Sequence, residues 1–145
     1  MQVGEQRTLY SQSGATFTSI VAIGYADGDA CPRSRRKAEA DGSFVVADIE
    51  VGKFFTIQPD GTSKALLEEI DGQPLGAANF ATRDSKGCLW LTVSTRSLPW
   101  SAGIIKGSKD GYIVVIDDHG PRVVADGVNF ANELRSDGRG VRAYG

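Results

Sequence analysis

The chain has 145 residues, which is normally one domain and is long enough to bury a hydrophobic core. Its 16 basic and 18 acidic residues nearly cancel, so no global field attracts nucleic acid or acidic membranes. No apolar run approaches the ~18 residues of a membrane span, and the first residues lead into no secretory signal. These absences predict a globular protein with a cytoplasmic location and neither a nucleic-acid nor a membrane partner.

The first 40 residues differ from the rest, since they show no regular alternation of strands and turns. They include the basic cluster Arg33–Lys37, which lacks interleaved aromatic residues and is therefore interpreted as a solvated loop rather than a phosphate site. We expect a single domain overall, made of a poorly matched segment at 1–40 and a repetitive part at 41–145. The two cysteines, Cys31 and Cys88, have no metal-type spacing and predict reduced thiols.

From residue 41 onward, Asp-Gly pairs separate short runs of β-branched and aromatic residues, a pattern typical of strands and turns. No window of a dozen residues shows helical periodicity with caps. The sequence therefore predicts an all-β fold of meandering antiparallel strands. The expected strands are Ser43–Asp48, Lys53–Gln58, Ala65–Glu68, Phe80–Arg83, Cys88–Ser94, Tyr112–Asp117 and Pro121–Ala125.

One phrase of the sequence occurs twice. Ala78–Gly87 and Ala131–Gly140 each begin Ala-Asn, with Asp five residues and Gly eight residues after the Asn. The two asparagines, Asn79 and Asn132, lie 53 residues apart, a spacing compatible with successive propeller blades and one inserted loop. A repeat that places Asn at the same point of successive blades can aim both amides at a common axis.

The repeat extends upstream of these asparagines. Gly52–Gly61 is similar to Gly111–Gly120, because in each an apolar strand ends in Ile and continues through an acidic turn to Gly. Each unit then has the strand content of a four-stranded blade. At ~40–45 residues per blade, the chain holds about three four-stranded antiparallel blades, a partial β-propeller. Because an unclosed array leaves sheet edges exposed, we expect self-association into a homo-oligomer that completes it.

Several other side chains have simpler interpretations. Asp84 and Asp137, each followed three residues later by Gly, are predicted turn formers. His119 is the only histidine and lies in a turn with no nucleophile nearby, so no catalytic triad is proposed. Trp100 lies in the loop Ser97–Lys109, where it could line a pocket. Asn79 and Asn132 could also simply satisfy loop backbone groups.

The segment from residue 41 to 137 resembles the senescence marker protein/gluconolactonase family of six-bladed propellers, also called regucalcin-like. The resemblance rests on three stretches. They are Asp41–Asp48 with Gly52–Gly61, the string Asn79-x4-Asp84-x2-Gly87-Cys88-Leu89-Trp90, and Gly111–Ile113 continuing to Asp126–Asn132. It implies a metal-dependent lactonase, with Ca²⁺ or Zn²⁺ on the propeller axis and Asn79 and Asn132 as metal ligands. In such an enzyme the ion polarises the lactone carbonyl while an Asp activates water.

The chain also departs from the family pattern. Ala30 stands where the family has an acidic ligand, and Ala77-Ala78-Asn79-Phe80 lacks the Arg and Asp that often flank the first asparagine. Glu133 replaces a usual Gly, and no residue matches the family's catalytic Asp. Catalytic residues therefore remain unassigned.

The resulting hypothesis is a gluconolactonase-like sugar-lactone hydrolase fold with a divalent-cation site that is truncated and catalytically incomplete. The alternative is a non-catalytic propeller module for oligomerisation or binding. A third interpretation is a truncated gene product without a selected function. Substrate, metal and oligomer number stay open at this point.

Overall fold

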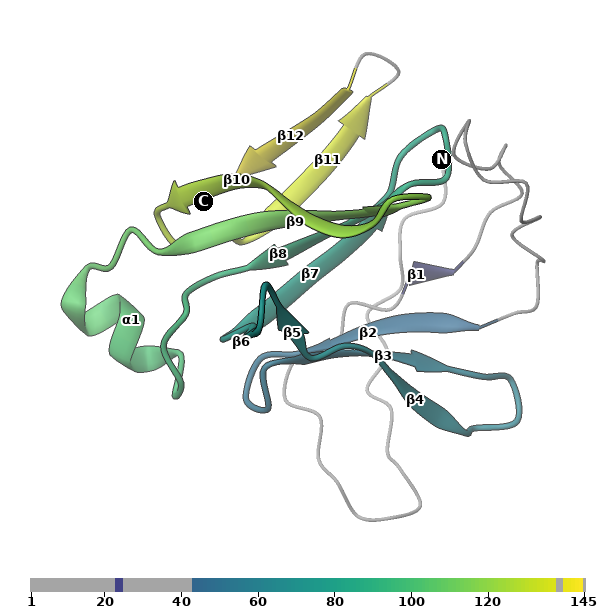
Figure 1. The fold of residues 1–145 in the computed structure, drawn as a ribbon, viewed down its shortest axis with the longest axis horizontal. Helices are drawn as coiled ribbons and strands as arrows, with labels where there is room; N and C mark the ends of the chain where they lie inside the picture. The colour runs from purple at the N-terminus through teal and green to yellow at the C-terminus, as the bar shows by residue number, and fades with distance from the viewer. Residues whose placement is uncertain (1–22, 25–42, 138–139, 145) are drawn as a thin grey trace.

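The computed structural model describes residues 23–24, 43–137 and 140–144. These residues form antiparallel β-sheets and one short helix, so the predicted all-β class is confirmed (Figure 1). Each strand of the two larger sheets pairs with its neighbour in the sequence, as a meander requires.

The first sheet has four strands in sequential order, and its strands β2 to β4 lie below the second sheet in Figure 1. It joins a two-residue strand that falls within the poorly matched segment 1–40 to three strands of the repetitive part. Its pairing is in register along β2 and β3, from Phe44 opposite Ile57 to Asp48 opposite Lys53. The strands are β1 (Ile23–Gly24), β2 (Phe44–Asp48), β3 (Lys53–Ile57) and β4 (Ser63–Leu67).

The second sheet also has four strands in sequential order. Its central pair, β8 and β9, is in register from Leu89 opposite Ile116 to Val93 opposite Tyr112. Both outer strands contain irregularities, one near the start of β7 and two within β10. The strands are β7 (Ala78–Arg83), β8 (Leu89–Val93), β9 (Gly111–Asp117) and β10 (Gly120–Val128).

Two hairpins complete the strand content. The first, β5 (Glu69–Ile70) with β6 (Gln73–Pro74), turns at Asp71-Gly72 and was not expected from the sequence. The second joins β11 (Glu133–Asp137) to β12 (Gly140–Tyr144). The seven predicted strands are all confirmed, with ends that differ by a few residues.

The sequence repeat corresponds to a structural repeat. β3 and β4 occupy the same places in the first sheet as β9 and β10 do in the second, and β11–β12 matches β7–β8. The edge strand β7 packs beside both β2 and β11. The described residues thus form two four-stranded sheets and two two-stranded hairpins, of which β11–β12 continues the repeat and β5–β6 does not. Where about three four-stranded antiparallel blades were expected, the described residues show two four-stranded antiparallel sheets, and no described sheet closes on itself.

One apolar core contains residues of both larger sheets and holds the two sheets together. Alternate residues of β2 and β8 point into it, as expected for strands with one face packed on a neighbouring sheet. Phe54 and Tyr112, among the largest side chains of the core, are fully buried and come from the corresponding strands β3 and β9. Burial of these aromatic side chains is a principal stabilising contribution to the pairing of the two units.

The turns between strands use aspartate in a common way. Asp48 accepts hydrogen bonds from the backbone N–H groups of Glu50 and Val51, and Asp117 accepts one from His119. Such contacts satisfy N–H groups that the tight connections leave unpaired. Asp60, of the Asp60-Gly61 pair, accepts from the Thr62 N–H at 2.8 Å in the same way, so this Asp-Gly turn has a direct structural basis.

The helix α1 (Ser101–Lys106) departs from the prediction of no helix. It is six residues long and contains Gly103, so it lacks the length and periodicity by which a sequence reveals a helix. A Cβ at Gly103 would lie 2.4 Å from the Thr95 hydroxyl oxygen, which shows that packing on Thr95 positions the helix. It ends at Gly107, where φ of 61° permits the left-handed cap.

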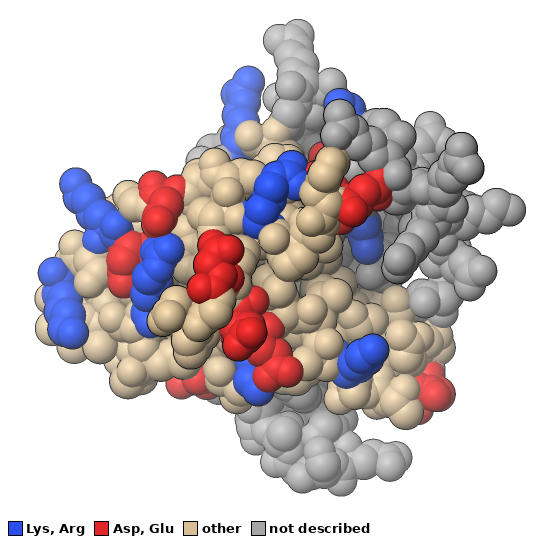
Figure 2. All heavy atoms as spheres, viewed as in Figure 1, with Lys and Arg blue, Asp and Glu red and all other residues tan. Residues whose placement is uncertain are grey.

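Some sequence-based expectations lie outside the described residues, namely those for Cys31, for Ala30 and for the cluster Arg33–Lys37. Cys88 is disulfide-bonded, so the expectation of a reduced thiol is wrong at that position. Among the described residues, no helix is long and apolar enough to cross a membrane. Figure 2 shows basic and acidic side chains interspersed on one face of the molecule, in keeping with the balanced composition.

Candidate functional site

The structure brings the two repeat-related asparagines into direct contact. The Nδ2 group of Asn79 donates a hydrogen bond to Oδ1 of Asn132 across 3.0 Å. Asn79 lies near the start of β7, and Asn132 immediately precedes β11. The residues head equivalent strands of adjacent units, and the packing of β7 beside β11 brings their amides together.

A β-bulge positions the first amide. The pairing of β7 with β8 shifts between Ala78, opposite Val93, and Phe80, opposite Thr92, so Asn79 has no partner of its own on β8. Bulges redirect the side chain of the extra residue and recur beside functional sites. Here the Phe80 N–H donates to the Thr92 hydroxyl at 3.1 Å, which holds the strand on the far side of the bulge.

A buried serine determines how the Asn79 amide is turned. The Ser94 hydroxyl donates to the carbonyl of Ala131 at 2.8 Å and accepts from Asn79 Nδ2 at 2.7 Å. Since a hydroxyl has a single hydrogen, its donation to Ala131 leaves only acceptor capacity for Asn79. The NH₂ end of Asn79 therefore faces both Ser94 and Asn132.

The second amide is fixed through its backbone. The Thr92 hydroxyl donates to the carbonyl of Asn132 at 3.1 Å, while Ser94 holds the preceding residue in the same way. Thr92 and Ser94 are both fully buried and lie on β8 or just beyond it. We call these four residues, Asn79, Thr92, Ser94 and Asn132, the neutral amide cluster. The cluster links the β7–β10 sheet to the β11–β12 hairpin.

The chemistry available to this cluster is that of neutral oxygen and N–H groups. Amide oxygens are suitable ligands for hard cations such as Ca²⁺, but here an N–H of Asn79 points at Asn132 Oδ1. Turning the Asn79 amide end for end would present two oxygens at nearly the same places, because the two ends of an amide are nearly isosteric. Among the described residues, no group of three or more His, Cys, Asp and Glu side chains could hold a metal ion.

The other candidates of the sequence analysis have structural surroundings. The Asp84 carboxylate accepts from the N–H groups of Lys86 and Cys88 and from the Trp90 indole, which confirms it as a turn former. The side chain of Asp137 lies outside what the structure describes. His119 is exposed in its turn and lies 3.3 Å from the Asp117 carboxylate, with no catalytic arrangement around it in the described chain.

Trp100, expected in the loop Ser97–Lys109, lies directly before α1. Its indole N–H donates to Glu50 at 2.8 Å, and its ring meets that of Phe130 edge to face with centroids 6.3 Å apart. Trp100 therefore attaches the α1 segment to the β2–β3 turn on one side and to the segment before β11 on the other. Its role as a pocket wall stays a prediction.

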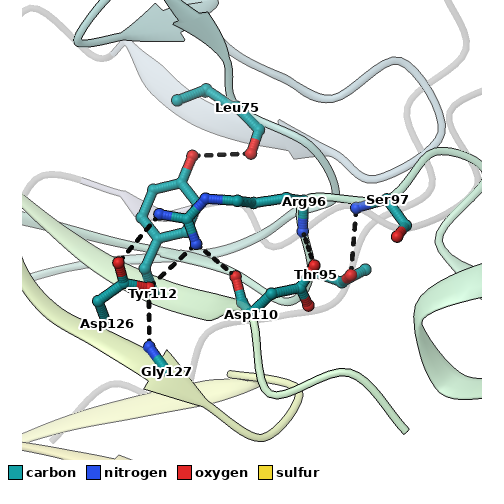
Figure 3. Close-up of polar contacts among 8 residues, drawn as sticks. All are labelled: Leu75, Thr95, Arg96, Ser97, Asp110, Tyr112, Asp126 and Gly127. Atoms are coloured by element: carbon teal, nitrogen blue, oxygen red, sulfur yellow. Dashed lines mark hydrogen bonds and ion pairs between the residues drawn. The ribbon is translucent and has the colours of Figure 1, made fainter. Parts of the chain in front are cut away.

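Sequence reasoning missed a second cluster, which is drawn in Figure 3. The Arg96 guanidinium lies 4.3 Å from the centre of the Tyr112 ring and makes two hydrogen bonds to the Asp126 carboxylate, at 3.0 and 3.2 Å. It also donates to the carbonyl of Asp110 at 2.7 Å. The charged cluster, meaning Arg96, Asp110, Tyr112 and Asp126, thus links the end of β8 to β9 and β10.

Burial and charge affect the ionisable groups of the charged cluster in opposite directions. Burial raises the pKa of Tyr112 to about 12, and its hydroxyl donates to the carbonyl of Leu75 at 2.7 Å. Hydrogen bonding to Arg96 lowers the pKa of Asp126 from its usual value. Asp110 accepts from the Arg96 N–H through Oδ2, whereas its Oδ1 is a buried atom without a hydrogen-bond partner within the described chain.

A scan of the chain against protein-family models gives no match, and a search of curated proteins gives none either. The assignment of function therefore depends on the geometry of the chain itself.

Proposed function

We propose that this chain is a partial β-propeller of gluconolactonase-like architecture whose neutral amide cluster binds a divalent cation weakly, without lactone turnover by the chain alone. The proposal depends on one observation above all. Two asparagines in equivalent positions of a 53-residue repeat lie within 3.0 Å of each other at the heads of neighbouring strands. Sequential four-stranded meanders packed on one another are the arrangement of propeller blades, which supports the same architecture.

The two amides suit a hard cation once the Asn79 amide is turned. Ca²⁺ ligands lie 2.3–2.6 Å from the ion, so oxygens sharing an ion are separated by about 3 Å, similar to the present Nδ2–Oδ1 distance. Both ligands are neutral, and affinity for Ca²⁺ increases with the number of charged ligands. We therefore expect a dissociation constant of ~10⁻⁴–10⁻³ M or weaker, in the range of extracellular Ca²⁺ modules.

A bound cation would polarise a carbonyl of a lactone, which is the chemistry that the resemblance implies. The chain's own contribution to this site is positional. Asn79 and Asn132 hold the amides, Thr92 fixes the backbone of Asn132, and the bulge directs Asn79 toward it. Amides neither remove nor supply protons at neutral pH, so these residues bind without acting as a general base.

A titration tests the proposal directly. We expect Ca²⁺ or Zn²⁺ to shift the side-chain amide resonances of Asn79 and Asn132. Asn79→Ala and Asn132→Ala should each abolish the shift of the asparagine that remains. Asn129→Ala is a matched control, because Asn129 is an exposed asparagine three residues before Asn132. Binding that survives both substitutions would contradict the site. Lactone hydrolysis abolished by Asn79→Ala would contradict the non-catalytic part.

A non-catalytic module for oligomerisation or binding is a second candidate, favoured by the sheet edges. Strands β4 and β10 each pair on one side only within the described sheets, and no described sheet closes on itself. Such edges can pair with another chain. Sedimentation distinguishes the candidates: a homo-oligomer unaffected by chelators favours the module, whereas a monomer whose melting depends on the cation favours the cation site.

A further inference from the structure

Ser94 stands out in the neutral amide cluster because it contacts both units and is completely buried, at 0% exposure. It follows β8 directly, and its hydroxyl reaches Ala131, 37 residues later in the chain. Neither the repeat nor the resemblance to lactonases singles it out. Its position places a single rotatable hydrogen between the Ala131 carbonyl and the Asn79 amide.

The hydrogen-bond count shows what that hydrogen does. With the Ser94 hydrogen on the Ala131 carbonyl, only an N–H of Asn79 can bond to Ser94, and the second N–H bonds to Asn132. If the Asn79 amide turned, its oxygen would face Ser94 and would need the same hydrogen. Ser94 would then have to leave a buried carbonyl without its donor, which is unfavourable.

From this geometry we infer that Ser94 is a positioning residue that keeps the Asn79 amide in its NH₂-inward orientation and thereby lowers the cation affinity of the Asn79–Asn132 pair. The inference rests on the proposed cation site for its effect on affinity, but the orientation itself is independent of any ligand. The neutral Ser94 side chain thus regulates the site by determining which end of the Asn79 amide faces Asn132.

The first test measures the orientation. Selective ¹⁵N-asparagine labelling yields signals from only three side chains, Asn79, Asn129 and Asn132, so each is assigned by substitution. In the Ser94→Ala variant we expect one Asn79 NH₂ proton to move upfield because it loses its acceptor. Ser94→Cys fills the space with a weak acceptor and should act in the same direction, which provides a second variant if Ser94→Ala folds poorly.

Thr95→Val is the matched control. Thr95 is also buried and lies next in the chain, but its hydroxyl accepts from the Ser97 N–H rather than from Asn79. We expect this variant to leave the Asn79 resonances where they are in the unsubstituted chain. Unchanged Asn79 resonances in both Ser94 variants, or an equal shift in Thr95→Val, would overturn the inference.

The second test measures affinity. Ser94→Ala should bind Ca²⁺ about threefold to tenfold more tightly than the unsubstituted chain, the change expected from removing one hydrogen bond that opposes the turned amide. Thr95→Val should bind with unchanged affinity. Moved resonances with equal Ca²⁺ affinity would overturn the role of Ser94 in regulating the site. Moved resonances without Ca²⁺ binding by any variant would refute the cation site and leave the orienting role supported.

Discussion

Ser94 and Arg96 lie two residues apart just after β8, yet they belong to two polar clusters that follow opposite physical rules. Ser94 is a buried member of a neutral network, in which it both donates and accepts, and that network reaches the surface at Asn132. Arg96 belongs to a charged network in which its side chain is 45% exposed and that of Asp126 is 58% exposed. The comparison shows that the end of β8 makes two kinds of link. Neutral hydrogen bonds from Ser94 hold the segment before β11, and the charge of Arg96 holds β10 of the same sheet.

The difference matters for function because the clusters differ in what can change. The charged cluster has one favourable arrangement, since a guanidinium and a carboxylate pair in a single sense. An amide can turn end for end without altering its shape, so the neutral amide cluster has two arrangements of similar volume. Of the two, only the neutral cluster has a second arrangement of the kind that the proposed cation site requires.

The largest expected effect comes from a residue that lies between the clusters. A Cβ at Gly111 would lie 2.5 Å from the Ser94 carbonyl oxygen and 2.9 Å from that of Val128. We expect Gly111→Ala to lower the free energy of unfolding by about 3 kcal/mol, because both obstacles are backbone atoms. Urea denaturation measures the change. Gly120→Ala, where a Cβ meets no atom within 4 Å, should cost only about 1 kcal/mol of left-handed strain.

The next effect tests the neutral amide cluster alone. Thr92→Val keeps the shape but leaves the Phe80 N–H and the Asn132 carbonyl without their partner. We expect the free energy of unfolding to fall by about 1–2 kcal/mol, with no dependence on salt because no charge is involved. If the decrease in the free energy of unfolding were halved between low and high salt, charge would contribute to the cluster and this prediction would be wrong.

A smaller effect tests the buried part of the charged cluster. Tyr112→Phe removes the bond to the Leu75 carbonyl and should cost about 1 kcal/mol at neutral pH while keeping the ring beneath Arg96. The folded pKa of Tyr112, about 12, exceeds the ordinary value of 10.0. Stability from the protonated phenol is therefore complete below pH 10 and is lost as pH rises from 10 toward 12. The difference between variant and unsubstituted chain should shrink over that interval in thermal melts.

The smallest effect distinguishes the clusters by their response to acid and salt. Hydrogen bonding to Arg96 lowers the pKa of Asp126 in the folded chain below its ordinary value of 3.8. Its contribution is therefore present above pH 3.8 and disappears as pH falls through the folded value. We expect Asp126→Asn to lower the melting temperature slightly at neutral pH and low salt, and not at all in strong acid or at high salt.

Asp117 titrates in the same acid range, because its hydrogen bond to Arg122 lowers its pKa to about 2. It is present in both the Asp126→Asn variant and the unsubstituted chain, so the difference between their melts isolates Asp126. A constant difference from pH 2 to pH 7 would contradict the assignment of the acid response to the Arg96–Asp126 pair.

Local patterns predicted the parts of the fold that local physics determines. Short runs of β-branched and aromatic residues in Lys53–Ile57 and Gly111–Asp117 identified strands, and the aspartates beside glycines identified turns. The helix α1 and the hairpin β5–β6 were missed because each is too short for a periodic signal. What positions α1 is its packing on Thr95, a contact that no local pattern encodes.

For the candidate site, the repeat identified Asn79 and Asn132 because equivalent positions of packed units face each other. Ser94, Thr92 and Arg96 were missed, since their partners are 30 to 40 residues away in sequence and belong to no motif. A useful signal was the stretch Thr92–Arg96, which directly follows apolar strand residues and is polar at every position except Val93. Only the fold shows which of its members face the amides.

The sequential order of strands also has a consequence for how the protein assembles. Each larger sheet can form from contiguous sequence, which keeps the loop-closure cost low and favours rapid local folding. The bond between Asn79 and Asn132 spans 53 residues and requires neighbouring units to be in place. The side-chain resonances of these two asparagines should therefore be among the last native signals to appear during refolding, and they report when neighbouring units have docked.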